Sequence, residues 1–214
     1  WSDTNSMLVN KCKTKEMIVH FGKKTIDSVV PIAINGVNIE RVNNFKLLGV
    51  VFSSDLSWDN HVQNMLGKAA KRIYCIPYLV RARVNQADIV IVYCSLNRSI
   101  LEYACPVWHP GLSKKQSSDI EKVQKRCLKL IYPTLSYNEA LKEAHLETLS
   151  DRREKQTQKL FQEMKRPDHP LHELLPLRDE GTRTTRVTYP YLIPVAKPTR
   201  YGRGFIPYCI SRRY

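Results

Sequence analysis

The stretch 45–58, FKLLGVVFSSDLSW, decides the fold. Its first half, 45–52, is apolar and predicts a β-strand. Ser53, Ser54 and Asp55 break that strand, and Ser57 and Trp58 then lead into a helix. Residues before this stretch read as short strands, and residues after it read as helices. We therefore expect an α+β chain in which a small sheet unit precedes a helical unit.

The residues before the stretch predict a small antiparallel sheet. Residues 17–21 alternate in the way expected of a strand with one face more buried. A hairpin is predicted over 32–39, because Asn35 and Gly36 both tolerate positive φ and separate two short alternating runs. The strand 45–52 then completes the antiparallel set.

Three amphipathic helices are predicted after the stretch, and with short loops they can pack as a small bundle. The first spans 57–76 and ends at Pro77, and the second spans 86–104 and ends at Pro106. The third starts at a capping box made by Ser113 and Gln116. The apolar stripes that identify these helices are Trp58, Val62, Met65, Ala69, Ile73 and Ile76 in the first, Ile89, Tyr93, Leu96, Ile100 and Tyr103 in the second, and Ile120, Val123, Cys127 and Leu130 in the third.

Several polar side chains are expected to lie away from these stripes. His61, Lys68 and Lys71 fall outside the first stripe, and Arg98 and Glu102 fall on the other side of the second helix. The face of the third helix opposite its stripe carries four cations, which are Lys122, Lys125, Arg126 and Lys129.

The last third of the chain is expected to contain two more helices and then a proline-rich segment. Ser136 and Glu139 form a second capping box for a short helix that runs to 144, and 149–164 is a further helix, highly charged and weakly amphipathic. Seven prolines follow Arg166 and forbid long helices. Residues 178–186 are expected to be exposed or mobile. The end, 200–214, mixes aromatics with arginine, which suits base stacking, but its apolar core at 205–208 favours an arm tucked onto the parent fold.

Composition points to a polyanionic partner. The 214 residues carry 34 Lys and Arg against 20 Asp and Glu, a formal net charge of +14. Such an excess favours nucleic acid, less often a membrane surface, although a merely basic soluble protein has the same composition. No apolar run is long enough to cross a bilayer, and the first residues do not predict a signal peptide. The first residue is Trp1 rather than Met, and we read the chain as part of a longer protein.

The cysteines indicate a reducing compartment. Six are spread along the chain without a CxxC pair, so neither a zinc ribbon nor a redox pair is predicted. Four of them, Cys75, Cys94, Cys105 and Cys127, lie on or beside apolar stripes and are expected to be reduced core residues. This pattern suits an intracellular protein.

The four cations of the third helix are the best physical clue to function. Like charges on one helix face repel one another, so the isolated helix gains nothing from them. A phosphate backbone would relieve this repulsion, but salt-bridge partners elsewhere in the fold would do so equally well. The sequence leaves these two interpretations even.

No complete catalytic or metal site is visible. His169 and His172 lack a third ligand at a suitable spacing, and a loop explains them better. Asp55 and Asp59 lie near a helix start, where they serve capping and the helix dipole. Nucleotide-binding glycine motifs, a P-loop, HExxH and GxSxG are all missing. We assign no metal ligand.

Taken together and in order, five motifs resemble the reverse transcriptase of LINE-type (non-LTR) retrotransposons. The resemblance covers nearly the whole chain. Each motif is loose, whereas the order and spacing of the set are fairly specific. The motifs are Asn10-x-x-Lys13-Thr14-x-x-Met17, residues 45–50, residues 55–62, residues 98–108 and residues 122–126, with further likeness at 167–172 and 205–209.

The resemblance implies a polymerase fragment. Residues 1–57 would be the last strands of the palm, 58–132 the three-helix thumb, and 133–214 a C-terminal helical and proline-rich basic segment. The thumb grips an RNA–DNA or RNA template–primer duplex through its backbone, which implies that Lys68 and Lys71 and the four cations of the third helix contact phosphates. The rest of the palm and the fingers would be the other partners. The resemblance also implies an intracellular location, with the nucleus as one option.

The resemblance also implies roles for individual residues. Lys13 matches a lysine that is proposed as general acid for the pyrophosphate leaving group. Without the resemblance, a plain surface lysine in a turn explains Lys13 far better. Phe45, Leu48 and Gly49 match a hairpin that steadies the primer end, with Leu47 where a tyrosine is commoner.

One departure from the family limits the activity. The Tyr/Phe-Ala-Asp-Asp strand that holds two metal ions is not in this chain, and Mg²⁺ is expected only for a full polymerase. We therefore expect no cofactor here and no polymerase activity from the chain alone. The alternative is a non-enzymatic interaction module, derived from such an element, that binds nucleic acid or protein.

Overall fold

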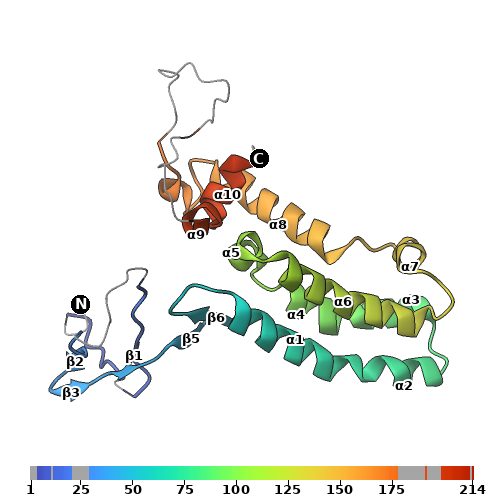
Figure 1. Cartoon of the computed structure of the whole chain (residues 1–214), viewed down its shortest axis with the longest axis horizontal. Coiled ribbons are helices and arrows are strands. Elements are labelled where there is room, and N and C mark those ends of the chain that lie inside the picture. Colours follow the sequence, from blue (N-terminus) through green and yellow to red (C-terminus); the bar gives the residue numbers. More distant parts are fainter. Residues whose placement is uncertain (1–3, 11, 21–28, 178–190, 192–198, 213) are drawn as a thin grey trace. The chain divides into compact units, whose positions relative to one another are not determined.

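The computed structural model describes residues 4–10, 12–20, 29–177, 191, 199–212 and 214 (Figure 1). Short strands come first and helices follow, so the predicted α+β class is confirmed. The contacts group the chain into two compact units, Trp1–His61 and Val62–Tyr214. We describe each unit by itself.

The first unit contains short strands and little core. They pair as three separate two-stranded sheets, β1 with β4, β2 with β3 and β5 with β6. Ile39 and Val50 are its buried apolar side chains among the described residues. The strands are β1 (Lys15–Glu16), β2 (Ala33–Ile34), β3 (Val37–Asn38), β4 (Glu40–Arg41), β5 (Asn44–Leu47) and β6 (Val50–Ser53).

Two sequence expectations for this unit need correction. The single antiparallel set is wrong, because β1 pairs with β4 in parallel. The strand predicted over 17–21 is also wrong for its described part, 17–20, since the strand here is β1, two residues earlier. Ion pairs between the two strands fix this register: Arg41 binds the Glu16 carboxylate at 3.2 Å, and Lys15 binds Glu40. Alternation of apolar residues gave no sign of this charged pairing.

The hairpin predicted at Asn35 and Gly36 is confirmed. β2 and β3 are antiparallel, with Ala33 opposite Asn38. Asn35 and Gly36 have φ of 49° and 74°, the left-handed pair that a tight two-residue hairpin requires.

The single strand predicted over 45–52 is wrong, because the residues form a second tight hairpin. β5 and β6 are antiparallel, with Phe45 opposite Phe52. The turn consists of Leu48 at φ 46° and Gly49 at φ 88°. Leucine rarely takes positive φ, so the local sequence pattern did not predict a turn at this point.

The first helix is shorter than predicted. α1 spans Asp59–Ile73 and α2 spans Cys75–Arg81, with the break at Tyr74. Proline clashes with the carbonyl four residues before it, so Pro77 ends α1 at Ile73 and is itself accommodated in the first turn of α2. The predicted stripe from Val62 to Ile76 is buried as expected.

The second predicted helix is interrupted by a π-helical turn. α3 (Gln86–Tyr93) passes through η2 (Cys94–Arg98) into α4 (Ser99–Glu102). A π turn holds one residue more than an α turn, so the residues after it change face. Asn97 and Leu101 are therefore fully buried, whereas the predicted Leu96 and Tyr103 are 38% and 54% exposed.

The helix predicted to run to 104 also ends early. Ala104, at φ 51°, takes a left-handed conformation after Glu102, and Pro106 lies in the first turn of α5 (Cys105–Trp108) instead of closing the second helix. η3 (His109–Gly111) follows. Arg98 is half-buried, and Glu102, expected to face away, points toward the later helix α8.

Capping boxes start the next two helices as predicted. Ser113 and Gln116 cap α6 (Lys114–Ile131), and Ser136 and Glu139 cap α7 (Tyr137–Glu143). α8 (Leu149–Met164) has the predicted bounds, and Thr148 caps it by accepting a hydrogen bond from the Asp151 amide. α8 is weakly amphipathic as predicted, because two polar side chains, Arg153 and Thr157, belong to its buried face.

The chain end packs on α8 as a helix. η4 (His172–Leu174), α9 (Thr199–Gly202) and α10 (Phe205–Ser211) are short. Phe161, Tyr191, Cys209 and Ile210 form a buried cluster, which agrees with the predicted arm on the parent fold. Residues 178–186, expected to be exposed or mobile, lie outside the described residues.

The main core of the helical unit joins α1, α2, α3, α6 and α7 through Ile73, Ile76, Ile89, Cys127 and Ala140. α6 also packs against α8. The six cysteines are free, with Cys105 and Cys127 buried and Cys75 and Cys94 half-buried. The three segments inferred from the resemblance, 1–57, 58–132 and 133–214, stay a prediction, while the contacts group 62–214 as one unit.

Candidate nucleic-acid interface

The basic face of α6 is exposed along its length. Lys122, Lys125, Arg126 and Lys129 all lie at the surface. The opposite face buries Ile120, Gln124, Cys127, Leu128 and Ile131. Because that apolar and polar core fixes the rotation of α6, the four cations are held toward solvent on one side.

The neighbours of these cations are mostly neutral. Lys122 pairs with Asp119 of its own helix at 2.7 Å, and this hydrogen bond lowers the pKa of the Asp119 carboxyl. Lys125 lies 5.0 Å from the centroid of the Tyr137 ring, and the Lys129 ammonium donates to the Pro133 carbonyl at 2.7 Å. One of the two interpretations from the sequence was that the cations have salt-bridge partners elsewhere in the fold. Among the described residues, their one carboxylate partner is Asp119, which belongs to α6 itself.

A buried polar network orients α6. Gln124 accepts a hydrogen bond from the Tyr93 hydroxyl at 2.7 Å and donates to the Tyr137 hydroxyl at 2.9 Å and the Glu147 carbonyl at 3.0 Å. Burial raises the pKa of Tyr93, so its hydroxyl stays protonated and can donate. The network ties α6 to α3, α7 and the residues before α8.

Glu121 extends this anchoring to the start of α8. Its carboxylate accepts hydrogen bonds from the amides of Leu149 at 3.1 Å and Ser150 at 3.3 Å, and from the Tyr137 hydroxyl. A carboxylate at a helix N-terminus interacts favourably with the helix dipole. Glu121, which precedes Lys122 in the sequence, therefore binds the start of α8 and Tyr137 and does not pair with the cations.

Lys68 and Lys71 lie on a different helix, α1, where both are exposed. Two hydrogen bonds join the middle and end of α1 to η2. Asn97 donates to the Ala69 carbonyl at 2.9 Å, and Arg72 donates to the Leu96 carbonyl at 3.1 Å. α6 packs against α2, α3, α7 and α8.

Lys13 lies in an exposed turn of the first unit. The Asn10 side chain accepts a hydrogen bond from the Lys13 amide at 3.1 Å, and the Asn10 carbonyl accepts from the Thr14 amide at 3.0 Å. This explains the spacing of Asn10, Lys13 and Thr14 in the sequence motif as a local turn. The Lys13 side chain is exposed.

The candidate primer-end residues meet in the β5–β6 hairpin. Leu48 and Gly49 form its tip, and Leu48 is 84% exposed, while Phe45 lies on β5 and is 36% exposed. The base of the hairpin is tied to the start of α1. The Trp58 ring lies 5.7 Å from that of Phe52 and 6.0 Å from that of His61.

His61 corrects one sequence expectation. It is 6% exposed, although the helical pattern placed it away from the apolar stripe. Its Nδ1 accepts a hydrogen bond from the Val51 amide at 3.3 Å. The strand preceding the helix supplies this contact, so helical periodicity alone could not have found it.

Two polar clusters that sequence reasoning missed join α8 to its neighbours. The first is a two-point ion pair, Arg152 Nε to Glu102 Oε1 at 2.5 Å and Nη2 to Oε2 at 3.0 Å. Gln156 also donates to Glu102 at 3.1 Å and accepts from Cys105 at 3.0 Å. Burial raises the pKa of the Cys105 thiol to about 12, so this cysteine is not a thiolate nucleophile.

The second cluster holds α10. Glu154 Oε2 accepts a hydrogen bond from the Tyr208 hydroxyl at 2.7 Å and lies 2.7 Å from His109 Nε2. Burial lowers the pKa of His109. The arrangement joins α8, η3 and α10, and its three groups point at one another, which suits a structural role. The sequence signal available was only the presence of polar residues among apolar ones.

Among the described residues, no group of three or more His, Cys, Asp or Glu side chains could hold a metal ion. Likewise, among the described helices none has the length and apolar character needed to span a bilayer.

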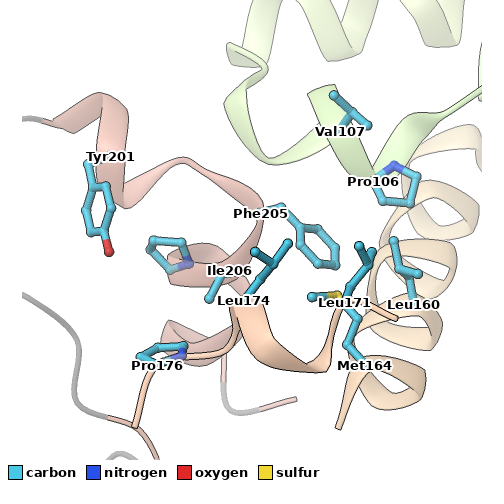
Figure 2. Close-up of a pocket in the computed structure, with 11 residues that line it drawn as sticks. Pro106, Val107, Leu160, Met164, Leu171, Leu174, Pro176, Tyr201, Phe205 and Ile206 are labelled. Atoms are coloured by element: carbon cyan, nitrogen blue, oxygen red, sulfur yellow. The ribbon is translucent and has the colours of Figure 1, made fainter. Parts of the chain in front are cut away.

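An apolar pocket of about 540 Å³ opens on the helical unit (Figure 2). Its walls come from α5, α8, the residues around η4 and the α9–α10 segment. Its described lining contains no charged side chain, and the Tyr201 hydroxyl is the one polar side-chain group in it. The residues that line it are Pro106, Val107, Leu160, Met164, Leu171, Leu174, Pro176, Tyr201, Phe205, Ile206 and Pro207.

Comparison of the chain with models of protein families, with curated proteins and with solved structures found no match.

Proposed function

We propose that the chain is the palm-end, thumb and C-terminal segment of a non-LTR retroelement reverse transcriptase, and that it binds a template–primer duplex through phosphates. The observation that carries the proposal is the exposed basic face of α6. Its four cations have one carboxylate partner among the described residues, the Asp119 side chain of the same helix. A nucleic-acid backbone is a favourable partner for such a face, because cations that neutralise its phosphates release bound counterions.

The first unit supports the proposal in a second way. Its described apolar side chains are largely exposed, among them Leu8 at 100%, Val30 at 82% and Leu48 at 84%. Exposed apolar side chains of this kind would be covered if the first unit packed against another part of a protein. In this proposal that part is the remainder of the palm and the fingers.

The chain itself is not expected to polymerise DNA. Nucleotide transfer by two metal ions needs a set of carboxylates that this sequence does not contain in the family's form. Lys13 would act as general acid only beside those carboxylates. Incorporation of a nucleotide by the purified chain on a primed RNA template would contradict this part of the proposal.

Charge substitution on α6 tests the proposed binding surface. The variant carries Lys122→Gln, Lys125→Gln, Arg126→Gln and Lys129→Gln, and its affinity for an RNA–DNA hybrid is measured across salt. Each lost phosphate contact should reduce the slope of log K against log salt by about 0.9. Affinity should fall equally for all sequences.

A charge-matched variant is the control. Lys142, Lys155, Lys159 and Arg166 lie on α7, on α8 or just after α8, and all four are exposed. Changing them to Gln removes the same four charges, so a general effect of net charge would appear in both variants. Equal losses in the two variants would remove α6 from the proposal.

A non-enzymatic interaction module is the second candidate, and the apolar pocket on α5 and α8 favours it. Pockets lined by Leu, Met, Phe and Pro take apolar side chains from partners. A folded chain that binds no hybrid duplex at low salt would support this candidate over the first.

A further inference from the structure

A regular stripe of cations and tyrosines runs along α1 and α2. Lys68, Lys71, Tyr74, Tyr78 and Arg81 are spaced by three, three, four and three residues, and all are exposed. Tyr74 joins the two helices in right-handed helical geometry, at φ −58° and ψ −25°, so the helical path continues through it. In Figure 1, α2 continues the direction of α1. Residues three or four positions apart are neighbours on a helix surface, so each member of the stripe adjoins the next.

The other face of the same segment is buried. Ala69, Ile73 and Ile76 are at most 5% exposed and pack into the core of the helical unit. The core therefore fixes which way the stripe faces. Tyr74 and Tyr78 are 68% and 62% exposed, although burial of a tyrosine ring against a partner lowers the free energy.

The two tyrosine rings hold each other in a defined arrangement. Their centroids are 6.1 Å apart and their planes meet at 83°, an edge-to-face contact. Such a contact restricts both side chains before any partner arrives, which lowers the entropy lost on binding. An outer ring face stays available for stacking.

The charged residues that flank the tyrosines in the sequence are all of one sign. Between Asn60 and Ala87 the sequence contains Lys68, Lys71, Arg72, Arg81 and Arg83 and no Asp or Glu. A surface for an ordinary protein partner would mix both signs around its aromatic centre. Aromatic rings that alternate with cations alone are the composition that binds bases and phosphates together.

Unpaired bases fit this stripe better than a duplex does. In a duplex, both faces of an internal base are already stacked, so a tyrosine ring cannot reach them. The stripe from Lys68 to Arg81 is about 20 Å long at a rise of about 1.5 Å per residue. That length accommodates a short single strand whose phosphates lie near the cations.

We propose that Tyr74 and Tyr78, flanked by Lys68, Lys71 and Arg81, bind a single-stranded nucleic acid by stacking on its bases. This inference rests on the proposed nucleic-acid function, but it names a surface other than α6 and a different ligand. Single-stranded RNA adjoining the duplex is the ligand that the two surfaces together would hold.

An oligonucleotide pair separates stacking from charge. The full chain is titrated with a labelled oligouridine of about 12 nucleotides, within the site sizes of single-strand-binding folds, and with an abasic strand of equal length. Both strands carry the same phosphates, so a preference for oligouridine measures base contacts alone. The wild-type chain should bind oligouridine more tightly than the abasic strand.

Tyrosine variants assign that preference to the stripe. Tyr74→Ala with Tyr78→Ala should weaken oligouridine binding about 10-fold or more and abolish the preference over the abasic strand. Tyr74→Phe with Tyr78→Phe keeps the ring faces and should keep the preference. Tyr103→Ala, which removes another exposed tyrosine, should bind as the wild type does.

The outcomes distinguish this inference from the proposed function. If the alanine variant keeps the base preference while the α6 variant loses hybrid binding, the stripe is excluded and the α6 surface stands. If no hybrid binds but the base preference depends on Tyr74 and Tyr78, the stripe stands and the duplex proposal fails. A wild-type dimer that dissociates in the alanine variant would overturn the inference in favour of self-association.

Discussion

The Arg152 guanidinium on α8 donates two hydrogen bonds, of 2.5 and 3.0 Å, to the carboxylate of Glu102, the last residue of α4. The Glu102 side chain is 11% exposed, and this hydrogen bond raises the pKa of Arg152. The pair joins two helices that are separated by 50 residues, and it holds α8 against the segment that leads into α5.

Glu102→Ala should therefore destabilise the helical unit. The substitution leaves Arg152, which is 30% exposed, without its two-point partner. Because part of that charge can reach water, we expect a loss of about 1–3 kcal/mol in the free energy of unfolding, less than for a fully buried pair. Urea unfolding followed by circular dichroism measures it.

The control is a surface ion pair of the same helix. Glu147 pairs with Lys155 while both side chains are largely exposed. Glu147→Ala should change the free energy of unfolding by less than about 0.5 kcal/mol. Losses of equal size in the two variants would show that burial of the Glu102 pair has no energetic consequence.

The π-helical turn at η2 predicts an unusual tolerance to deletion. Removing the exposed Ser95 should convert the π turn to an α turn, which keeps Tyr93, Asn97 and Leu101 on the buried face. The deletion variant should fold with nearly unchanged helix content, as measured by circular dichroism, and should unfold cooperatively.

Deletion of the exposed Lys155 from α8 provides the comparison. α8 is a regular α-helix, so the deletion rotates Thr157, Phe161 and Met164 away from the core. This second variant should lose cooperative unfolding. A Ser95 deletion that behaves as badly would mean that the π turn is needed for the packing of the helices.

Acid should weaken the attachment of α10 through His109. Burial lowers the folded-state pKa of His109 below its ordinary value of about 6.5. Below that value the unfolded chain binds a proton that the folded chain resists, so stability falls as pH falls from about 7.5 to about 5.5. The groups that face His109 are Glu154, Tyr208, Arg153 and Arg212.

His109→Gln should flatten this part of the stability–pH curve, measured by urea unfolding at each pH. Acidic residues elsewhere titrate lower, so their contribution remains in both proteins. His145→Asn is the control, because His145 is exposed and has φ 51°, which asparagine tolerates. An unchanged slope in His109→Gln would assign the pH dependence to another group.

The β5–β6 turn should respond to substitution in opposite directions at its two residues. Leu48 has φ 46° and Gly49 has φ 88°, the geometry for which Asn-Gly is preferred. Leu48→Asn should stabilise the hairpin and Gly49→Ala should destabilise it, each by about 0.5–1 kcal/mol. Hydrogen exchange at the amides of β6 reports both changes, and slower exchange in Gly49→Ala would contradict the account.

Some of this fold follows from local sequence signals. The Asn35–Gly36 hairpin and the capping boxes at Ser113 and Ser136 were predictable, because each signal concerns residues within a single turn. The basic face of α6 was equally readable, since helical spacing alone places its cations opposite the apolar stripe.

Other features depend on contacts that local patterns do not contain. The π turn at η2 moved Asn97 into the core, where it meets the Ala69 carbonyl of another helix. Arg153 and Thr157 made α8 look weakly amphipathic, although both are fully buried. Leu48 does not signal a turn. Long-range packing decided the first two of these cases against the local preference.

The candidate site divides in the same way. The exposure of Lys122, Lys125, Arg126 and Lys129 was predictable, but their lack of external carboxylate partners required the structure. The stripe that includes Tyr74 and Tyr78 was missed because Pro77 was taken as the end of the helix, which separated Tyr78 and Arg81 from Lys68 and Lys71. Because Pro77 lies in the first turn of α2, where proline is tolerated, the helical path continues past it and brings Tyr78 and Arg81 next to Tyr74.

The most direct test of the central claim is the affinity of the purified wild-type chain for an RNA–DNA hybrid, titrated between about 50 and 200 mM salt. The account predicts binding that is indifferent to sequence and weakens steeply as salt rises, since α6 contacts phosphates. A well-folded chain that does not bind the hybrid at low salt, or that binds it with no dependence on salt, would contradict the account.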